Sequence, residues 1–393
     1  MRNWLKWLIS FGHAILLLVL TAFWINTDFS YGDEQLLVKW SSIFKRVILN
    51  IDQDPPKSDF LFINLAFEKA LIPQEEGLGN EVITDRAKLA QFFEMLKRNQ
   101  KSVKFTICDV FLKGRSENDS LLQSSISGIK NIVFPTHHDE NGKIEELDIN
   151  VPCAIADYRM ASGGFLKFKL FQDEKLKTLP VYLFEKTEGR KISGNHGIYL
   201  DKGKLSLNSV IIDYQIRSHE LFQQGEYPVV NLSELLILPE EIIVNDFLKN
   251  RIVLMGDFNN DVHETIFGST PGTLILLNVY LTLKAGYHII TYWWLIFIVL
   301  GYTVFSRLML FPDNDNEKLK KINWIGPLFG SVTYLSVLSM ISYLLFNIHI
   351  QVLILTLYVS LLRYSIRLKK IEWNAQQVKE WALGLRETYF NFK

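Results

Sequence analysis

Apolar residues gather in a few long runs that flank a long segment of mixed polarity. The runs cover residues 7–25, 287–311, 322–346 and 350–366. Each approaches the roughly 20 apolar residues that a helix needs to cross a bilayer. The pattern predicts four transmembrane helices, one before and three after an extracytoplasmic domain of residues 26–286.

Cationic residues flank the apolar runs on one side of the predicted membrane. Arg2 and Lys6 precede the first run, and the later cations are Arg307, Lys318, Lys320, Lys321, Arg363, Arg367, Lys369 and Lys370. Because Lys and Arg favour the cytoplasmic side, residues 1–6, the loop 312–321 and the tail 367–393 are predicted to be cytoplasmic. A cleaved signal peptide is the less favoured alternative, since no small-x-small cleavage site follows the first run.

Short apolar runs alternate with helical patterns inside the domain. The predicted strands lie at 60–66, 103–111, 131–135 and 251–257, and the predicted helices at 84–97, capped by Thr84, and at 121–129. Strand and helix in alternation favour a parallel sheet covered by helices. The expected fold class is therefore α/β, with a mainly parallel sheet flanked by helices.

The middle of the domain has a different pattern. Residues 164–171 alternate apolar and basic side chains, and 180–184 and 210–214 are short apolar runs, which together predict additional antiparallel strands. Segments 71–81 and 185–204, rich in Gly and charge, are predicted to be a loop and an exposed excursion.

The last helix of the domain, predicted at 274–284, leads almost directly into the second apolar run. No flexible linker is expected between them. Any signal that leaves the domain is therefore expected to leave through this junction.

Composition narrows the possible functions. Lys plus Arg and Asp plus Glu each number 42, so the chain lacks the concentrated positive charge typical of nucleic-acid binding. Neither Cys108 nor Cys153 has the spacing of a metal site. Cys108 lies in an apolar run and is expected to be buried, while a disulfide between the two cysteines remains open.

Polar residues at the ends of predicted strands are the candidate ligand-binding residues, because ligands of parallel sheets bind beyond the carboxyl ends of the strands. Asn64, Asp109, His137 and Asp257 each follow a strand, and Asp261, His263 and Thr270 belong to the loop after the last one. For each of these residues, loop capping is the alternative role.

The sequence predicts neither catalysis nor a cofactor. It contains no P-loop, GxGxxG, GxSxG, HExxH or EF-hand motif. His137 and His138 are adjacent, and on an extended chain they would point to opposite sides, so we expect no metal site there. A periplasmic hydrolase using Asp109, Asp257 and His263 is the least favoured alternative, because no nucleophile is paired with a base.

Several short motifs occur in an order that resembles a known family. They are Ile83-Thr-Asp85-Arg86 with Leu89, Ile107-Cys-Asp109-Val-Phe with Asp119-Ser-Leu-Leu, Ala156-Asp157-Tyr158, and Arg251-Ile-Val-Leu-Met-Gly-Asp257 followed by Asp261, His263, Thr270-Pro271-Gly272 and Asn278. Their order, together with one span before and three after, resembles CHASE sensory domains of the second type. The resemblance covers most of residues 60–286 and implies an extracytoplasmic sensory module. Members of that family usually continue into a cyclase, kinase or histidine kinase, whereas here only a short tail follows.

The sequence thus favours a multi-pass protein of the bacterial inner membrane with a periplasmic sensory or docking domain. Its expected partners are the lipid bilayer and another membrane or envelope protein that supplies the output, and a homo-oligomer is possible. The alternative is a structural subunit of a multi-protein cell-envelope complex, contacting its neighbours through the excursion 185–204 and the tail.

Overall fold

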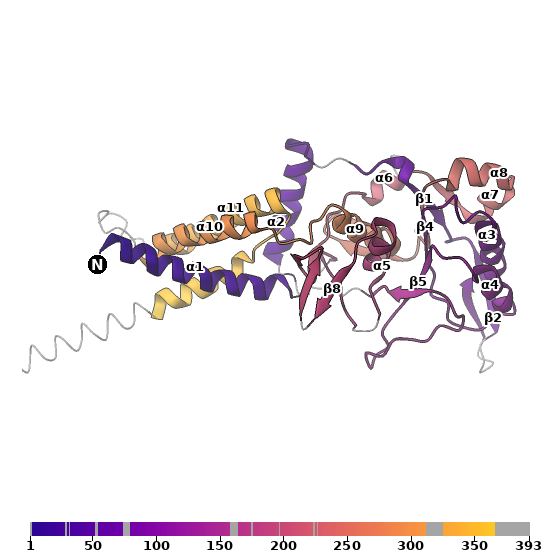
Figure 1. Ribbon diagram of the computed structural model, residues 1–393, viewed down its shortest axis with the longest axis horizontal. Coiled ribbons are helices and arrows are strands. Elements are labelled where there is room, and N and C mark those ends of the chain that lie inside the picture. The colour runs from indigo at the N-terminus through magenta and orange to yellow at the C-terminus, as the bar shows by residue number, and fades with distance from the viewer. Residues whose placement is uncertain are drawn as a thin grey trace, which may run out of the picture. The chain divides into compact units, whose positions relative to one another are not determined.

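A computed structural model describes residues 2–27, 30, 32–51, 54–73, 79–157, 164–173, 176–195, 197–222, 225, 227–311 and 325–365 (Figure 1). The chain divides into two compact units. One is helical and consists of Met1–Ile25, Tyr292–Leu345 and His349–Lys393, and the other contains Asn26–Thr291 and Phe346–Ile348. The second unit is the α/β domain that the sequence predicts.

Six parallel strands form the central sheet of the α/β domain, in the order β12-β1-β13-β4-β5-β6. They are β1 (Phe60–Asn64), β4 (Phe105–Asp109), β5 (Ile132–Thr136), β6 (Cys153–Ile155), β12 (Val229–Asn231) and β13 (Ile252–Gly256). Strands β1, β5 and β13 are buried along their whole length, as a parallel sheet covered on both faces requires. The predicted parallel sheet is confirmed.

Helices cover both faces of this sheet (Figure 1). Leu61 and Ile63 of β1 pack into one core cluster with side chains of α3 (Arg86–Arg98), α4 (Asp119–Ile126) and α7 (Leu232–Ile237). On the opposite face lie α5 (Leu179–Glu188) and α9 (Gly272–Lys284), where Tyr182 of α5 packs against Phe105 of β4. Helix α9 is buried from Gly272 to Leu283, so it belongs to the interior of the domain.

Both cysteines are free thiols. Cys108 lies in β4 and is fully buried, as the sequence predicts. Burial raises the pKa of its thiol well above the ordinary value. Cys153 is partly buried in β6, and β5 separates the two strands.

Helix α3 begins one residue later than the sequence suggests. Asp85, not Thr84, is the N-cap, and its carboxylate accepts hydrogen bonds from the N–H groups of Ala87 (3.0 Å) and Lys88 (3.2 Å). Thr84 instead ends β3 (Asn80–Thr84). A carboxylate satisfies the free N–H groups and also matches the positive end of the helix dipole.

We predict that Asp85→Ala lowers the free energy of unfolding by about 1 kcal/mol, because two backbone N–H groups lose their acceptor. The measurement is thermal unfolding of the full chain in mild detergent. Gln91→Ala, at an exposed position of the same helix, is the control. Equal melting temperatures of the two variants would contradict the capping role.

The described part of the domain also contains four small antiparallel sheets. They pair β7 (Lys167–Lys169) with β11 (Ser209–Ile211), β2 (Lys69–Pro73) with β3, β14 (Val262–Thr265) with β15 (Gly268–Pro271), and β8 (Ile192–Asn195) with β9 (Ile198–Asp201) and β10 (Lys204–Ser206). Strands β7 and β11 confirm the prediction of antiparallel strands near 164–171 and 210–214.

One local prediction is wrong and two are incomplete. Residues 180–184 belong to α5, where Pro180 occupies the first turn, the position at which a helix accepts proline. The two ends of the predicted loop at 71–81 belong to β2 and β3, while its middle, 74–78, lies outside the described residues. The predicted excursion at 185–204 is mostly exposed, as expected, but it contains β8 and β9. Lys202 and Gly203 both have positive φ and connect β9 to β10 by a tight turn, which allows these polar segments to pair locally.

The helical unit contains α1 (Asn3–Ile25), α10 (Tyr292–Leu310), α11 (Ile325–Phe346) and a helix at Val352–Ser365. Among the described residues, three helical stretches are long and apolar enough to cross a membrane: Asn3–Ile25, Tyr292–Leu310 and Phe329–Phe346. The helix Val352–Ser365 is apolar but shorter, so the fourth span stays a prediction. The chain has the helices of a membrane protein.

Polar contacts join α10 to its neighbours within the helical unit. On α1, His13 Nδ1 lies 2.8 Å from Ser306 Oγ and Thr21 Oγ1 lies 2.6 Å from Tyr302 Oη. On α11, the indole N–H of Trp294 donates to Ser342 Oγ at 2.8 Å. Such side-chain hydrogen bonds are the contacts that hold helices together in lipid.

Candidate functional site

A cavity of about 530 Å³ lies at the carboxyl edge of the central sheet. Five of the seven residues expected there line it: Asp109, His137, Asp257, Asp261 and His263. Other lining residues, Lys69, Glu81, Arg86, Lys113 and Asp157, carry charge as well. The structure therefore brings most of the predicted ligand-binding residues to one polar cavity.

Strand register explains why these side chains meet. Asp109 of β4 pairs with Gly256 of β13, and Gly256 pairs with Asn64 of β1 on its other side. Because the strands are parallel, all three end at the same edge of the sheet, and the residues that follow them leave toward the same space. Asp257 follows β13 directly, and His137 follows β5.

Asn64 and Thr270 make structural contacts instead. Asn64 is buried, accepts hydrogen bonds from the N–H groups of Ala66 (3.1 Å) and Phe258 (3.3 Å), and donates to Asn231 and Asn259 (both 3.3 Å). Thr270, also buried, donates to the carbonyl of Gly268 at 3.2 Å within the β14–β15 turn. For these two residues, the loop-capping alternative describes the contacts in the structure.

Asp109 is the titratable group at the inner end of the cavity. Burial, with a further contribution from the nearby Asp261, raises the pKa of its carboxyl to about 6. The hydroxyl of Thr273, in the first turn of α9, donates to Asp109 Oδ2 at 2.8 Å and partly offsets this effect. Asp109 therefore changes charge close to neutral pH, in contact with α9.

His137 and His138 converge on one carboxylate. The Nδ1 atoms of His137 and His138 donate to the two oxygens of Asp157, at 2.7 Å and 2.5 Å. We expected adjacent histidines to point to opposite sides, but the extended strand ends at Thr136, so strand alternation no longer applies to them. The hydrogen bond to Asp157 raises the pKa of His137. Burial would raise the pKa of Asp157, but the hydrogen bonds from both histidines hold it below the ordinary value.

Asp257 and Asp261, two further acids of the site, are also paired. Lys69 Nζ lies 2.8 Å from Asp257 Oδ2, and His263 Nε2 lies 3.0 Å from Asp261 Oδ1. Burial by itself would raise the pKa of Asp257, but hydrogen bonds from Lys69 and Asn260 lower it. Across the described residues, no group of three or more His, Cys, Asp and Glu side chains is arranged to hold a metal ion.

Sequence reasoning missed much of the cavity's basic lining. Arg86 is only 2% exposed. It forms an ion pair with Asp119 and donates hydrogen bonds to the carbonyls of Lys113 and Gly114. The sequence did hold a signal for Arg86 and Asp157 as site residues. Each belongs to one of the short motifs that carry the family resemblance, Ile83-Thr-Asp85-Arg86 and Ala156-Asp157-Tyr158. Lys69 and Glu81 belong to β2 and β3. Glu81 ends the segment 71–81 that the sequence predicts to be a loop, and Lys69 precedes that segment.

Gly256 lets α9 approach the sheet closely. A Cβ atom added at Gly256 would lie 2.2 Å from Thr273 Oγ1 and 3.6 Å from Asp109 Cβ. Because 2.2 Å is far inside the van der Waals distance, the Thr273 hydroxyl would have to rotate away. The hydrogen bond to Asp109 therefore depends on the glycine.

We predict that Gly256→Ala lowers the free energy of unfolding by about 1–2 kcal/mol. In a Thr273→Ala background the same change should cost much less, since the clashing hydroxyl is absent, and the two substitutions should be non-additive. Urea unfolding of the four proteins of this double-mutant cycle gives the measurement. Additive effects would show that the clash does not involve Thr273.

The arrangement combines a carboxyl that titrates near neutrality, two histidines and several cations around a volume suited to a small polar molecule. It offers hydrogen-bond donors and acceptors of both charges to a small molecule. No family model, no curated protein and no solved structure matches the chain.

Proposed function

We propose that the chain is a multi-pass protein of the bacterial inner membrane whose periplasmic α/β domain binds a small polar ligand or a partner. Occupancy of the cavity is transmitted through the membrane helices to a separate membrane or envelope protein. Three apolar helices of sufficient length support the membrane location. The resemblance to CHASE sensory domains of the second type supports the sensory role.

The observation that carries this proposal is the hydrogen bond between Thr273 and Asp109. Asp109 lines the cavity, and Thr273 lies in the first turn of α9. A ligand that pairs with Asp109 or changes its protonation alters the strength of this bond, because a charged acceptor binds a hydroxyl more strongly than a neutral one. Occupancy is thereby coupled to the position of α9.

Helix α9 provides the route out of the domain. It ends at Lys284, and α10 begins at Tyr292, after a short connection. Part of that connection is held by backbone hydrogen bonds, such as those from Tyr287 N–H to Thr282 O (3.1 Å) and from Ile290 N–H to Leu205 O (2.8 Å). A connection without slack passes a displacement of α9 to α10, which is a recognised form of signalling by helix shifts.

The test uses two measurements on the full chain. The first is a thermal-shift screen against a library of small carboxylates, phosphates and amines, in which the stabilisation by a true ligand should saturate. This stabilisation should be lost in Asp257→Ala. It should be kept in the control Glu240→Gln, at an exposed position on α8 (Glu240–Ile242). Disulfide formation between His13→Cys and Ser306→Cys, in a Cys153→Ser background, then reports movement of α10 against α1.

We expect the ligand to change the rate of this crosslink, and we expect Thr273→Val to abolish that change while preserving binding. A library without a saturable ligand, together with an unchanged crosslink, would contradict the sensory function.

A structural subunit of a cell-envelope complex is the second candidate. It is favoured by the apolar side chains that β9 and β10 expose, since Ile198, Leu200 and Leu205 are 60%, 38% and 43% exposed. Purification in mild detergent distinguishes the two functions. A large assembly of fixed stoichiometry would favour the structural subunit.

A further inference from the structure

The helix that follows α1 has an inverted distribution of polarity. It consists of α2 (Gly32–Ile43), which continues as the π-helix η1 (Phe44–Ile48). Its buried residues are mainly polar and recur at helical spacing: Glu34, Val38, Ser41, Ser42 and Lys45. Its opposite face is apolar and exposed, with Leu36 at 58%, Trp40 at 61%, Val47 at 71% and Ile48 at 65%. A helix on a water-exposed surface has the reverse arrangement.

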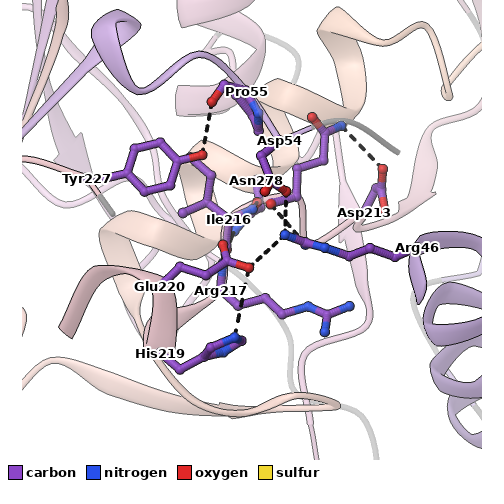
Figure 2. Close-up of polar contacts among 11 residues, drawn as sticks. Arg46, Asp54, Pro55, Asp213, Ile216, Arg217, His219, Glu220, Tyr227 and Asn278 are labelled. Atoms are coloured by element: carbon purple, nitrogen blue, oxygen red, sulfur yellow. Dashed lines mark hydrogen bonds and ion pairs between the residues drawn. The ribbon is translucent and has the colours of Figure 1, made fainter. Parts of the chain in front are cut away.

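Specific polar contacts hold the buried face on the α/β domain. Lys167 Nζ of β7 lies 2.8 Å from Glu34 Oε1, and both side chains are almost completely buried. At the other end, Arg46 forms ion pairs with Glu220 (2.7 Å) and Asp54 and donates to the carbonyl of Gln215 at 3.2 Å. Figure 2 shows Arg46 reaching into this network. The orientation of the helix is thus fixed, and so is the direction of its apolar face.

The same network connects the helix to α9. Asn278 of α9 accepts a hydrogen bond from the N–H of Ile216 (3.0 Å) and donates to its carbonyl (2.8 Å), next to Gln215 (Figure 2). The Arg46 end of η1 is therefore attached to the helix that leads to α10. The α2–η1 segment belongs to the framework of the domain.

One short segment of the domain marks where the chain enters and leaves it. We call residues 205–209 the anchor segment. Asn208 N–H donates to Asn26 Oδ1 (3.1 Å) and Ser209 Oγ donates to the carbonyl of Thr27 (3.3 Å). Ile290 N–H donates to the carbonyl of Leu205 at 2.8 Å. Asn26 directly follows α1, and Ile290 shortly precedes α10, so the anchor segment marks the place where the chain enters and leaves the domain.

Both ends of α2–η1 are tied to the same side of the domain. Gly32 follows Thr27 closely in the sequence. Lys45 donates to Tyr287 Oη at 3.2 Å and lies over the Tyr287 ring at 4.6 Å. The chain from Tyr287 to Tyr292, where α10 begins, can reach at most about 18 Å. The helix therefore runs along the part of the domain at which the chain enters and leaves it.

From these contacts we infer that α2–η1 lies in the membrane interface, with Leu36, Trp40, Val47 and Ile48 among the lipid headgroups. The occupant of the apolar face is the bilayer surface. Trp and aliphatic side chains on a helix that lies flat are the residues that enter this layer, to a depth of about 5–10 Å. The inference rests on the membrane anchoring proposed above but is independent of ligand binding.

The test is lipid quenching of a fluorophore in the full chain, reconstituted into phosphatidylcholine vesicles with or without doxyl-labelled phosphatidylcholine. Single cysteines for labelling replace Leu36 or Val47 in a Cys153→Ser background, where Cys108 is fully buried. Leu121→Cys is the control for an exposed position on the other face of the central sheet. Leu121 lies on α4, which covers the sheet face opposite α9, and it is 51% exposed. Leu300→Cys, 62% exposed on α10, is the control for membrane insertion.

We expect the labels at Leu36 and Val47 to lose about half of their fluorescence to the doxyl lipid, as a shallow interfacial position implies. The label at Leu121 should be unaffected. If Leu300 is quenched while Leu36 and Val47 behave like Leu121, the inference is overturned and the anchoring stands. Unquenched labels, together with disulfides between chains in the same cysteine variants left unlabelled, would assign the face to a second copy and would also overturn the inference. If Leu300 is not quenched, the anchoring and the inference both fail.

Discussion

Replacement of Lys167 by methionine is expected to lower the free energy of unfolding by about 3–5 kcal/mol, because it leaves a buried carboxylate without its counter-charge. Glu34 and Lys167 have side-chain exposures of 0% and 3% and lie 2.8 Å apart. Methionine keeps most of the volume of lysine, so the loss reports the charge and not a cavity. The pair joins α2 to β7, and its loss should release α2 before the central sheet unfolds.

Unfolding of the full chain in mild detergent measures the effect, and hydrogen exchange locates it. The double variant Glu34→Leu, Lys167→Met should recover most of the loss, since two matched apolar groups replace a buried pair without a residual charge. Arg98→Met is the matched control, because Arg98 and Glu240 form an exposed pair that contributes little. Equal effects of Lys167→Met and Arg98→Met would contradict the structural role of the buried pair.

Asp109→Asn is expected to stabilise the protein at pH 7.5, by about 1–3 kcal/mol. The folded-state pKa of Asp109 is about 6, above the ordinary value of 3.8 that applies to the unfolded chain. Between these values the unfolded state releases the proton and the folded state keeps it, so stability falls as pH rises from about 4 to about 6. Above pH 6 the whole cost is present, and asparagine removes it.

The measurement is the melting temperature of the full chain at pH 4.5 and pH 7.5, and the gain should be clearly larger at pH 7.5. Asp157→Asn is the control of opposite sign, because hydrogen bonds from His137 and His138 hold the pKa of Asp157 below its ordinary value. That carboxylate stabilises the fold above its unfolded pKa, and its removal should destabilise the protein at pH 7.5. A pH-independent effect of Asp109→Asn would contradict the raised pKa.

Apolar runs were sufficient to predict four of the six strands of the central sheet and the edge at which the cavity lies, but not the three-residue strands β6 and β12. Strands β1, β4, β5 and β13 are continuous apolar runs, and a parallel sheet places their ends at one edge. Asp109, His137 and Asp257 could therefore be placed at one cavity without knowing the order of the strands. The order itself depends on tertiary packing, and nothing local in the sequence indicates that β13 lies between β1 and β4.

The cavity's pairings could not be predicted for a related reason. Lys69 and Asp257 are far apart in the sequence, and their 2.8 Å contact follows from the β2–β3 hairpin, whose polar strands have no clear alternation.

The five residues 180–184 fit a buried strand and a helix equally well by apolarity, and only Pro180 pointed to a helix start. Helix α2 was not predicted, although Leu36, Trp40 and Val47 recur at helical spacing. What the sequence does not show is that this apolar face is exposed.

The position of β13 has a consequence for biosynthesis. Both neighbours of β1 in the sheet, β12 and β13, come from the last part of the domain. Phe60 of β1 therefore cannot pair with Ile252 of β13 until almost the whole domain has been synthesised. Contacts between residues so distant in sequence slow folding, because a long loop must close first. During synthesis β1 and β4 present unpaired apolar edges of the kind that aggregate. The domain can complete its sheet only shortly before α10 emerges from the ribosome, which places folding and the insertion of the second apolar helix close together in time.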